Sequence, residues 1–222
     1  AITKGNKTRL LNFSEIEHPL ALQIGGSDPK LLAEAAKIGV DWGYDEINLN
    51  VGCPSSRVSS GDFGAVLMKR KDHVAKCVDA MAQFSSNVPI SVKCRIAVDD
   101  QDPEKILPSF IKTVSNSGVS IFIIHARKAI LSGLSPKDNR KIPPIDYNLV
   151  KKIKTQFPQL EICLNGEIKD LSSVMNFIND GINGCMIGRE VYKNPSKILE
   201  NADEKIFKKM DLFRKSKKRT LY

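Results

Sequence analysis

The sequence predicts an α/β protein of the (β/α)8 TIM-barrel type, incomplete, with about six of the eight βα units present. Three observations carry this prediction. Short apolar strands alternate with amphipathic helical stretches, and the strands are rich in Val, Ile and Leu without polar alternation, which is typical of parallel strands buried on both faces. Each strand also ends in a polar or glycine-containing cluster. An open sheet gathers its ligand groups at one switch point, whereas equivalent polar ends on every strand indicate the mouth of a barrel.

Six segments have the strand pattern, and each leads into a short cluster that bears polar groups. The clusters read QIGG, NVGC, KCR, HAR, NGE and GR. Spacings of roughly 20 to 40 residues between strands fit βαβ repeats. The expected strands are 20–24, 46–51, 90–94, 121–125, 161–164 and 184–187.

Amphipathic segments between these strands predict the helices. The first follows Ser27-Asp28-Pro29, which offers a capping side chain and a first-turn proline, and it runs to Gly39. Gly118 and Gly181 stand where glycines are common just beyond helix ends. The other expected helices are 72–85, 103–117, 146–157 and 170–180.

A closed barrel needs eight units and typically about 250 residues, so we expect a partial barrel over residues 1–200, cut at its N-terminus.

Composition excludes several classes of protein. Hydrophobic content of 41% and charged content of 27% are ordinary for a globular protein. No apolar run approaches the roughly 18 residues of a membrane span. Five widely spaced cysteines without a CxxC pair argue against a zinc site and a disulfide framework, so we expect no metal. We expect a cytoplasmic protein. Because we expect the N-terminus to be missing, an organellar location with its targeting segment is the alternative.

The formal charge is +9, and eight Lys or Arg lie between Lys205 and Arg219. A polyanionic partner is one interpretation, because basic surfaces gather phosphates. A solvated helix face followed by a Lys-rich tail is the other. The charge alone does not decide between these two interpretations.

The strand ends suggest chemistry. Cys53 sits in a Gly-Cys-Pro turn directly after an apolar strand, where such folds place reactive groups. Asn165-Gly166 and Gly188-Arg189 follow the last two strands, where barrel enzymes often hold a phosphate. Lys93 and His125 end strands facing the same mouth, and a cation there stabilises the negative charge of a reduced flavin. Together they favour a phosphate-bearing cofactor.

Several motifs are then specific. LNVGCPS, G-x-F-G-A-x-L-M, VKCRI, DDQD, FIIHARKA, LSGLSPK, CMIGRE and YKNP together resemble tRNA-dihydrouridine synthase, most closely its A-type branch. The resemblance covers roughly residues 14–200. It implies an FMN-binding barrel that uses NADPH to reduce D-loop uridines of tRNA to 5,6-dihydrouridine.

The resemblance also implies roles for individual residues. Cys53 matches the general acid, and a thiol suits that task because it is mostly protonated near neutral pH yet able to release its proton. Asn50 would hold the uracil or order the loop. Lys137 and Arg140 lie in the basic loop 127–144 and are the expected tRNA contacts, with Asn50. The residues that match the family's flavin and phosphate contacts are Gln23, Lys93, His125, Asn165, Gly166, Glu167, Gly188 and Arg189.

The sequence departs from the family at both ends. The family's first strand, with its Ala-Pro-Met-like turn, and its second strand have no counterpart here. Residues 201–222 form a basic tail where a helical tRNA-binding domain would begin. Two alternatives therefore stand beside the enzyme: an inactive tRNA- or RNA-binding remnant, and another FMN barrel oxidoreductase.

Overall fold

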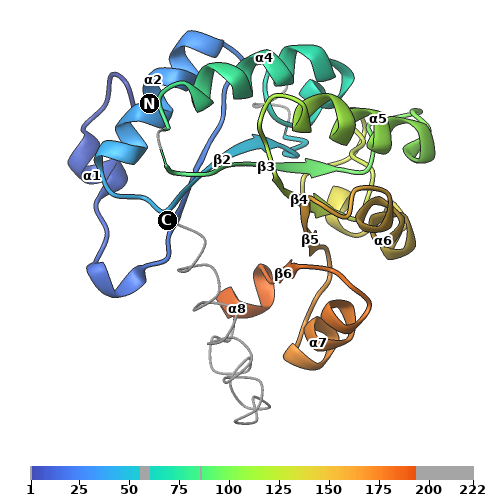
Figure 1. Ribbon diagram of the computed structural model, residues 1–222. Helices are drawn as coiled ribbons and strands as arrows, with labels where there is room; N and C mark the ends of the chain where they lie inside the picture. Colours follow the sequence, from blue (N-terminus) through green and yellow to red (C-terminus); the bar gives the residue numbers. More distant parts are fainter. Residues whose placement is uncertain (1, 56–60, 86, 194–222) are drawn as a thin grey trace.

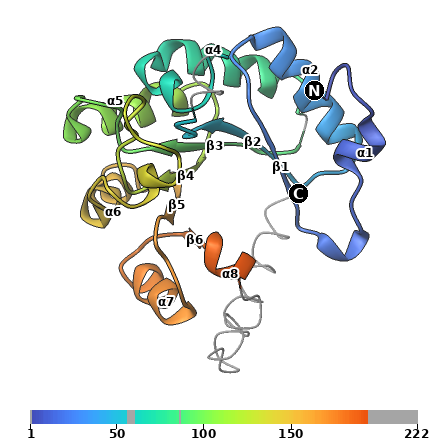
Figure 2. The ribbon, with the colours of Figure 1, turned by 180° about the vertical axis from the view of Figure 1, so that it is seen from behind.

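The computed structural model describes residues 2–55, 61–85 and 87–193. Six parallel strands form one sheet in the order β1-β2-β3-β4-β5-β6, and the sheet curls into an arc with the larger helices outside it (Figures 1 and 2). The strands are β1 (Ala21–Ile24), β2 (Glu46–Val51), β3 (Ile90–Arg95), β4 (Ile121–His125), β5 (Glu161–Asn165) and β6 (Gly184–Met186). This arrangement confirms the predicted incomplete (β/α)8 barrel.

Five longer helices connect the strands, and four of them begin at an aspartate whose side chain accepts backbone N–H groups. They are α2 (Pro29–Asp41), α4 (Lys71–Ala82), α5 (Pro103–Ser115), α6 (Tyr147–Gln156) and α7 (Leu171–Asn179). All five overlap the predicted helices. The sequence interpretation missed the short helices α1 (Lys7–Leu11) and α8 (Arg189–Lys193) and the 3-10 turns η1 (Glu15–Glu17) and η3 (Asp138–Arg140). A further 3-10 helix, η2 (Gly64–Lys69), lies between β2 and α4.

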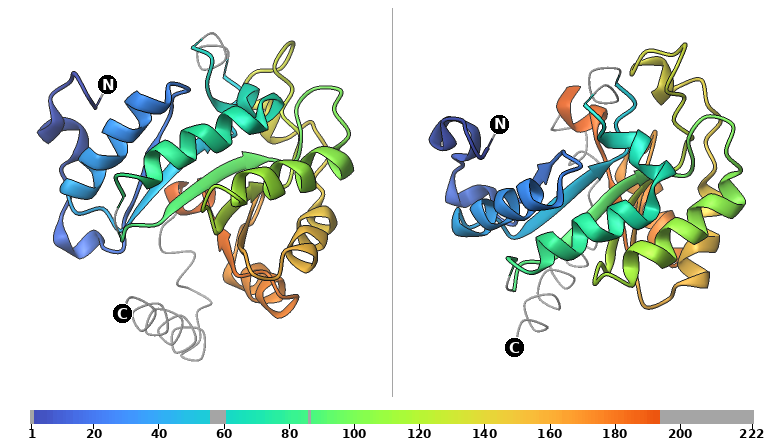
Figure 3. Two further views of the ribbon diagram at one scale, coloured as in Figure 1. Left: turned by 45° about the horizontal axis from the view of Figure 1, so that its top comes forward. Right: turned by 90° about the horizontal axis from the view of Figure 1, so that it is seen from above.

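The two faces of the sheet differ in character because side chains alternate along a strand. Toward the helices, β2 directs Ile47, Leu49 and Val51, all fully buried. Toward the inside of the arc it directs Glu46, Asn48 and Asn50. Figure 3 shows α2 and α4 side by side across the outer face, while the inner face is free of the large helices. The apolar core therefore lies between sheet and helices, and the concave face is left for polar groups.

Cysteines follow this division in part. Cys77 in α4 and Cys94 in β3 are buried in the core, whereas Cys163 and Cys185 are only half-buried. No helix in the described part of the chain is long and apolar enough to cross a membrane. The expected basic tail, residues 201–222, lies outside the described residues.

Helix α2 packs tightly against the sheet at Gly39. A Cβ added there would come within 2.6 Å of Ile47 Cδ1 and 2.8 Å of Leu22 Cδ2. Gly39→Ala should therefore lower the free energy of unfolding by about 1 kcal/mol, because an overpacking cost of roughly 2 kcal/mol exceeds the roughly 1 kcal/mol that alanine gains over glycine inside a helix. Urea denaturation measures the change. Glu34→Ala, at an exposed position of the same helix, should change it by less than about 0.5 kcal/mol. Equal stability of the Gly39 variant and the parent would contradict this packing.

Candidate active site

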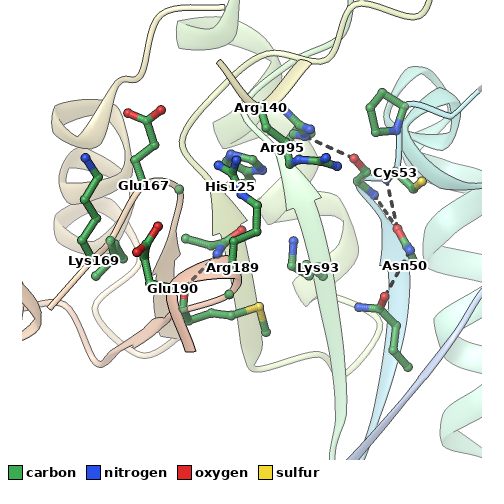
Figure 4. Close-up of a pocket in the computed structure, with 18 of the residues that line it drawn as sticks. Asn50, Cys53, Lys93, Arg95, His125, Arg140, Glu167, Lys169, Arg189 and Glu190 are labelled. Atoms are coloured by element: carbon green, nitrogen blue, oxygen red, sulfur yellow. Dashed lines mark hydrogen bonds between the residues drawn. The ribbon is translucent and has the colours of Figure 1, made fainter. Parts of the chain in front are cut away.

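A pocket of about 500 Å³ opens at the carboxyl ends of the strands (Figure 4). It brings together residues from all six strands or the turns that follow them. Every site residue predicted from the sequence lines it except Lys137. The predicted residues in the lining are Gln23, Asn50, Cys53, Lys93, His125, Arg140, Asn165, Gly166, Glu167, Gly188 and Arg189. Residues that the sequence interpretation did not select also line it, among them Arg95, Lys169, Glu190 and Lys193.

The turn after β2 holds Cys53 at the pocket wall. The side-chain Oδ1 of Asn50 accepts the backbone N–H groups of Gly52, at 3.0 Å, and of Cys53, at 3.1 Å. This is the local hydrogen bonding that lets asparagine shape a tight turn. The carbonyl of Cys53 accepts the N–H of Ala65 at 2.9 Å, which ties the turn to η2. Asn50 therefore orders the loop, one of its two expected roles.

Arg95 fixes this turn from the other side. Its side chain is only 3% exposed and donates to three backbone carbonyls: Gly52 at 3.2 Å, Lys128 at 3.1 Å and Asn139 at 3.0 Å. Burial, more than the neighbouring cations, lowers the pKa of Arg95 to about 10, so the group remains charged at neutral pH. The guanidinium thus links the Cys53 turn to the loop after β4. The signal was present in the sequence, since Arg95 lies two residues after Lys93 and must share its face.

Lys93 and His125 stand beside Arg95 at the ends of β3 and β4. The ammonium of Lys93 makes no hydrogen bond or ion pair with any residue that the structure describes, and burial with the adjacent Arg95 lowers its pKa to about 8. Burial, then Arg95, Lys93 and other cations, lowers the pKa of His125 to about 2. His125 is therefore neutral, and the positive charge of this wall resides on lysine and arginine.

Backbone geometry shapes the far wall, after β5. Gly166 has φ +124°, and a Cβ there would lie 2.9 Å from Cδ2 of His125, so only glycine fits against that ring. Tyr147 donates its hydroxyl proton to the Gly166 carbonyl at 2.7 Å, and Asn165 donates to the Met186 carbonyl at 2.8 Å. Glu167 also has a positive φ of +51°. These contacts set the spacing between the ends of β5 and β6.

The basic loop after β4 divides into buried and exposed parts. Arg127, the first cation of the loop, is only 5% exposed. Its Nη2 pairs with Oε1 of Glu167 at 2.9 Å, and its Nη1 donates to the Pro143 carbonyl. Asn139 is fully buried and holds the loop together by accepting the N–H of Ile130 and donating to nearby carbonyls. The loop consequently presents Arg140 to the pocket and leaves Lys137 exposed outside it.

These residues fit an anionic ligand. Lys93 lacks a partner within the described residues, a Cβ at Gly188 would meet nothing within 4 Å, and Arg189 lies beside it in the lining. Glu167 and Glu190 are the acidic members of the lining, and Glu167 is already paired with Arg127. Among residues 2–55, 61–85 and 87–193, no group of three or more His, Cys, Asp or Glu is placed to hold a metal ion.

Solved structures with a similar fold are TIM-barrel proteins. Morphinone reductase in complex with tetrahydroNAD matches with a TM-score of 0.54 at 13% identity, covering 76% of this chain and 46% of that one. TcOYE with pHBA matches with a TM-score of 0.59 at 12% identity, covering 80% and 48%. At such identities the likeness defines the fold alone, an α/β barrel with its pocket at the strand ends.

Sequence similarity then gives the family. The family model of dihydrouridine synthase (Dus) matches residues 1–221, and the chain belongs to that family. The tRNA-dihydrouridine(20/20a) synthase of Synechocystis sp. is 50% identical over 212 residues, 96% of this chain and 63% of the relative. The tRNA-dihydrouridine(20/20a) synthase of Escherichia coli O6:H1 is 54% identical over 202 residues, which cover 90% of this chain and 60% of the relative. The chain thus spans about three fifths of the length of these curated relatives.

The neutral state of His125 makes stability depend on pH. Its pKa is about 2 in the folded chain, against 6.5 for an unperturbed histidine, so below about pH 6.5 the unfolded chain binds more protons and stability falls as pH is lowered. His125→Gln should remove this dependence, reducing the loss of unfolding free energy by about 1 kcal/mol per pH unit below that value. Urea denaturation at pH 7.5 and 5.5 measures it.

His18 provides a control of opposite sign. The hydrogen bond with the Asp45 carboxylate raises the pKa of His18, so its contribution to stability is present at low pH and lost as pH rises. His18→Gln should therefore steepen the loss of stability on acidification. An unchanged pH dependence in His125→Gln would contradict a neutral, desolvated imidazole.

Proposed function

We propose that this chain carries the catalytic site of an enzyme that reduces uridine in the D-loop of tRNA to 5,6-dihydrouridine. The observation that carries the proposal is the Cys53 turn, which Asn50 and Arg95 hold against a pocket lined by cations. Family membership supports the reaction class, and the names of the relatives point to uridines 20 and 20a as the sites of reduction.

We further propose FMN as the cofactor and NADPH as its reductant. Bound FMN supplies a hydride to C6 of the uracil. Gln23, Lys93 and His125 would contact the flavin ring, and the ammonium of Lys93 is placed to balance negative charge on it. Asn165, Gly166 and Glu167 would line the other side. Gly188 and Arg189 would receive the phosphate, since glycine leaves room for the anion and arginine donates paired hydrogen bonds.

The chain's own chemical step is a proton transfer. As C6 gains the hydride, C5 needs a proton, and the Cys53 thiol gives its proton to C5 and becomes a thiolate. Lys93 and Arg95 line the same pocket as Cys53, so the thiolate that this step leaves would share the pocket with two cations. Water then returns a proton to the sulfur. The added hydride and proton together account for the two hydrogens of dihydrouridine.

Substrate access requires the target base to leave the stacked tRNA, as for other enzymes that act on a base. Arg140 lies at the pocket and Lys137 on the exposed side of the same loop, so one can contact the flipped nucleotide while the other contacts phosphates further out. Asn50 borders the position of the uracil. The basic residues 201–222 are a further proposed contact with tRNA.

Cys53→Ala tests the proton donor. With FMN, NADPH and unmodified tRNA, the variant should form dihydrouridine at least about 100-fold more slowly than the parent, because general acids contribute that much or more. FMN binding should be retained, since the thiol is not among the proposed flavin contacts. Dihydrouridine is measured by mass spectrometry of the digested tRNA.

Cys185→Ala is the matched control, because Cys185 is also a half-buried free cysteine but does not line the pocket. It should retain the parent rate. A Cys53 variant as fast as the parent would rule out the assigned donor. If the parent binds tRNA but forms no dihydrouridine, the chain acts in RNA binding and the enzymatic proposal fails.

A further inference from the structure

An unbroken line of polar side chains crosses the concave face of the sheet. Glu46, Asn48 and Asn50 alternate along β2 and so point to the same side. On either side of Asn48 lie its partners in register, Gln23 of β1 and Ser91 of β3. Asn48 is 3% exposed and Ser91 fully buried. Burial of this kind requires every polar atom to find a partner.

Hydrogen bonds join the five side chains end to end. The Ser91 hydroxyl donates to Oε1 of Glu46, and Asn48 Nδ2 donates to Ser91 Oγ at 2.6 Å. Gln23 Nε2 donates to Asn48 Oδ1 at 2.7 Å, and Asn50 Nδ2 donates to Gln23 Oε1 at 3.2 Å. The last acceptor, Oδ1 of Asn50, receives the N–H of Cys53. The line therefore runs from the amino-terminal residue of β2 to the proposed proton donor.

The groups at the two ends of this line require every hydrogen bond in it to be donated in the same direction, toward Glu46. An ionised carboxylate only accepts hydrogen bonds, so Ser91 must donate to Glu46 and its oxygen must face an NH2 group of Asn48. A backbone N–H only donates, so Asn50 must turn its oxygen toward Cys53 and its NH2 toward Gln23. Both requirements give Gln23 the same orientation, with its NH2 group toward Asn48 and its oxygen toward Asn50. Such an aligned series of hydrogen bonds is mutually strengthening.

We propose that Glu46, Ser91 and Asn48 are positioning residues for the Cys53 reaction, acting through the carboxamides of Gln23 and Asn50. This inference rests on the proposed function for its chemical meaning, but the structural link stands on the hydrogen bonds alone. The carboxylate at the base of β2 selects one orientation for each amide. Asn50 thereby keeps its oxygen under the Cys53 turn, which holds the thiol at a fixed place in the pocket.

The same arrangement constrains Gln23. Its oxygen accepts one hydrogen bond from Asn50, and one of its two N–H groups donates to Asn48. One N–H group and the second lone pair of the oxygen therefore remain for a ligand. The line thus couples the side chain expected beside the cofactor to the turn that carries the acid.

Ser91→Ala cuts the line between Glu46 and Asn48, and amide hydrogen exchange measures the result without cofactor or tRNA. We expect the N–H groups of Gly52 and Cys53 to exchange at least about fivefold faster than in the parent, because Asn50 is then free to rotate its oxygen away from them. Glu46→Gln keeps an acceptor oxygen for Ser91, so its exchange should remain within about twofold of the parent.

Ser85→Ala is the matched control. Ser85 is also a buried serine, 5% exposed, and lies beyond the end of α4, outside the pocket lining. Its hydroxyl donates to the carbonyl of Ala82, the last residue of that helix. It should leave exchange at Gly52 and Cys53 unchanged. If Ser91→Ala leaves those amides as protected as Ser85→Ala does, the proposed positioning role is wrong.

Steady-state kinetics of uridine reduction distinguish a failure of this inference from a failure of the proposed function. Ser91→Ala should lower kcat for uridine reduction about tenfold, with KM for tRNA within about twofold, because the acid is misplaced while the RNA contacts remain. A parent chain that forms no dihydrouridine, with the exchange response intact, would reject the reaction and leave the positioning line standing. An unaltered kcat in Ser91→Ala would overturn its role in the reaction.

Discussion

The pocket depends on two cations that are withdrawn from water, Lys93 and Arg95, neither of which is paired with a carboxylate in the described chain. Lys93 has no hydrogen-bonding partner in the described chain, and Arg95 is held by neutral carbonyls only. Desolvating a cation is costly, and the cost is visible in the lowered pKa of both groups. Burial, together with the field of these cations, lowers the pKa of His125 and keeps its imidazole neutral. An anion in this pocket would relieve all three effects at once.

The scaffold holds these cations through backbone contacts. Arg95 joins the Cys53 turn to the loop after β4, and buried Asn139 keeps that loop compact around its own carbonyls. On the opposite wall, the pair between Arg127 and Glu167 fixes the loop against the end of β5. The Cys53 turn, the basic loop and the far wall are therefore one connected unit, although they come from distant parts of the sequence.

The strand ends were predictable from the sequence because they follow from local patterns. Apolar runs identified the strands, and the parallel arrangement placed Gln23, Asn50, Lys93, His125 and Asn165 at one edge. Turn chemistry pointed to Cys53 and Gly166. These inferences needed only the alternation of side chains and the direction of the strands.

Long-range contacts were not predictable in this way. Nothing local to Arg127 indicates that Glu167, forty positions later, pairs with it and keeps it from the exposed surface of the loop. The separation of Lys137 from Arg140 depends on how the loop folds around Asn139. The hydrogen-bonded line on the concave face needed the register of three strands, which sequence periodicity does not provide.

Comparing FMN with riboflavin as ligands of this chain tests the central claim most directly, because the two differ only in the phosphate. Fluorescence titration should give FMN a dissociation constant at least about tenfold lower than that of riboflavin. Arg189→Gln should remove most of that difference, and Lys93→Met should weaken both ligands. Equal affinity for FMN and riboflavin, or unchanged affinity in Lys93→Met, would contradict an anion-binding flavin pocket.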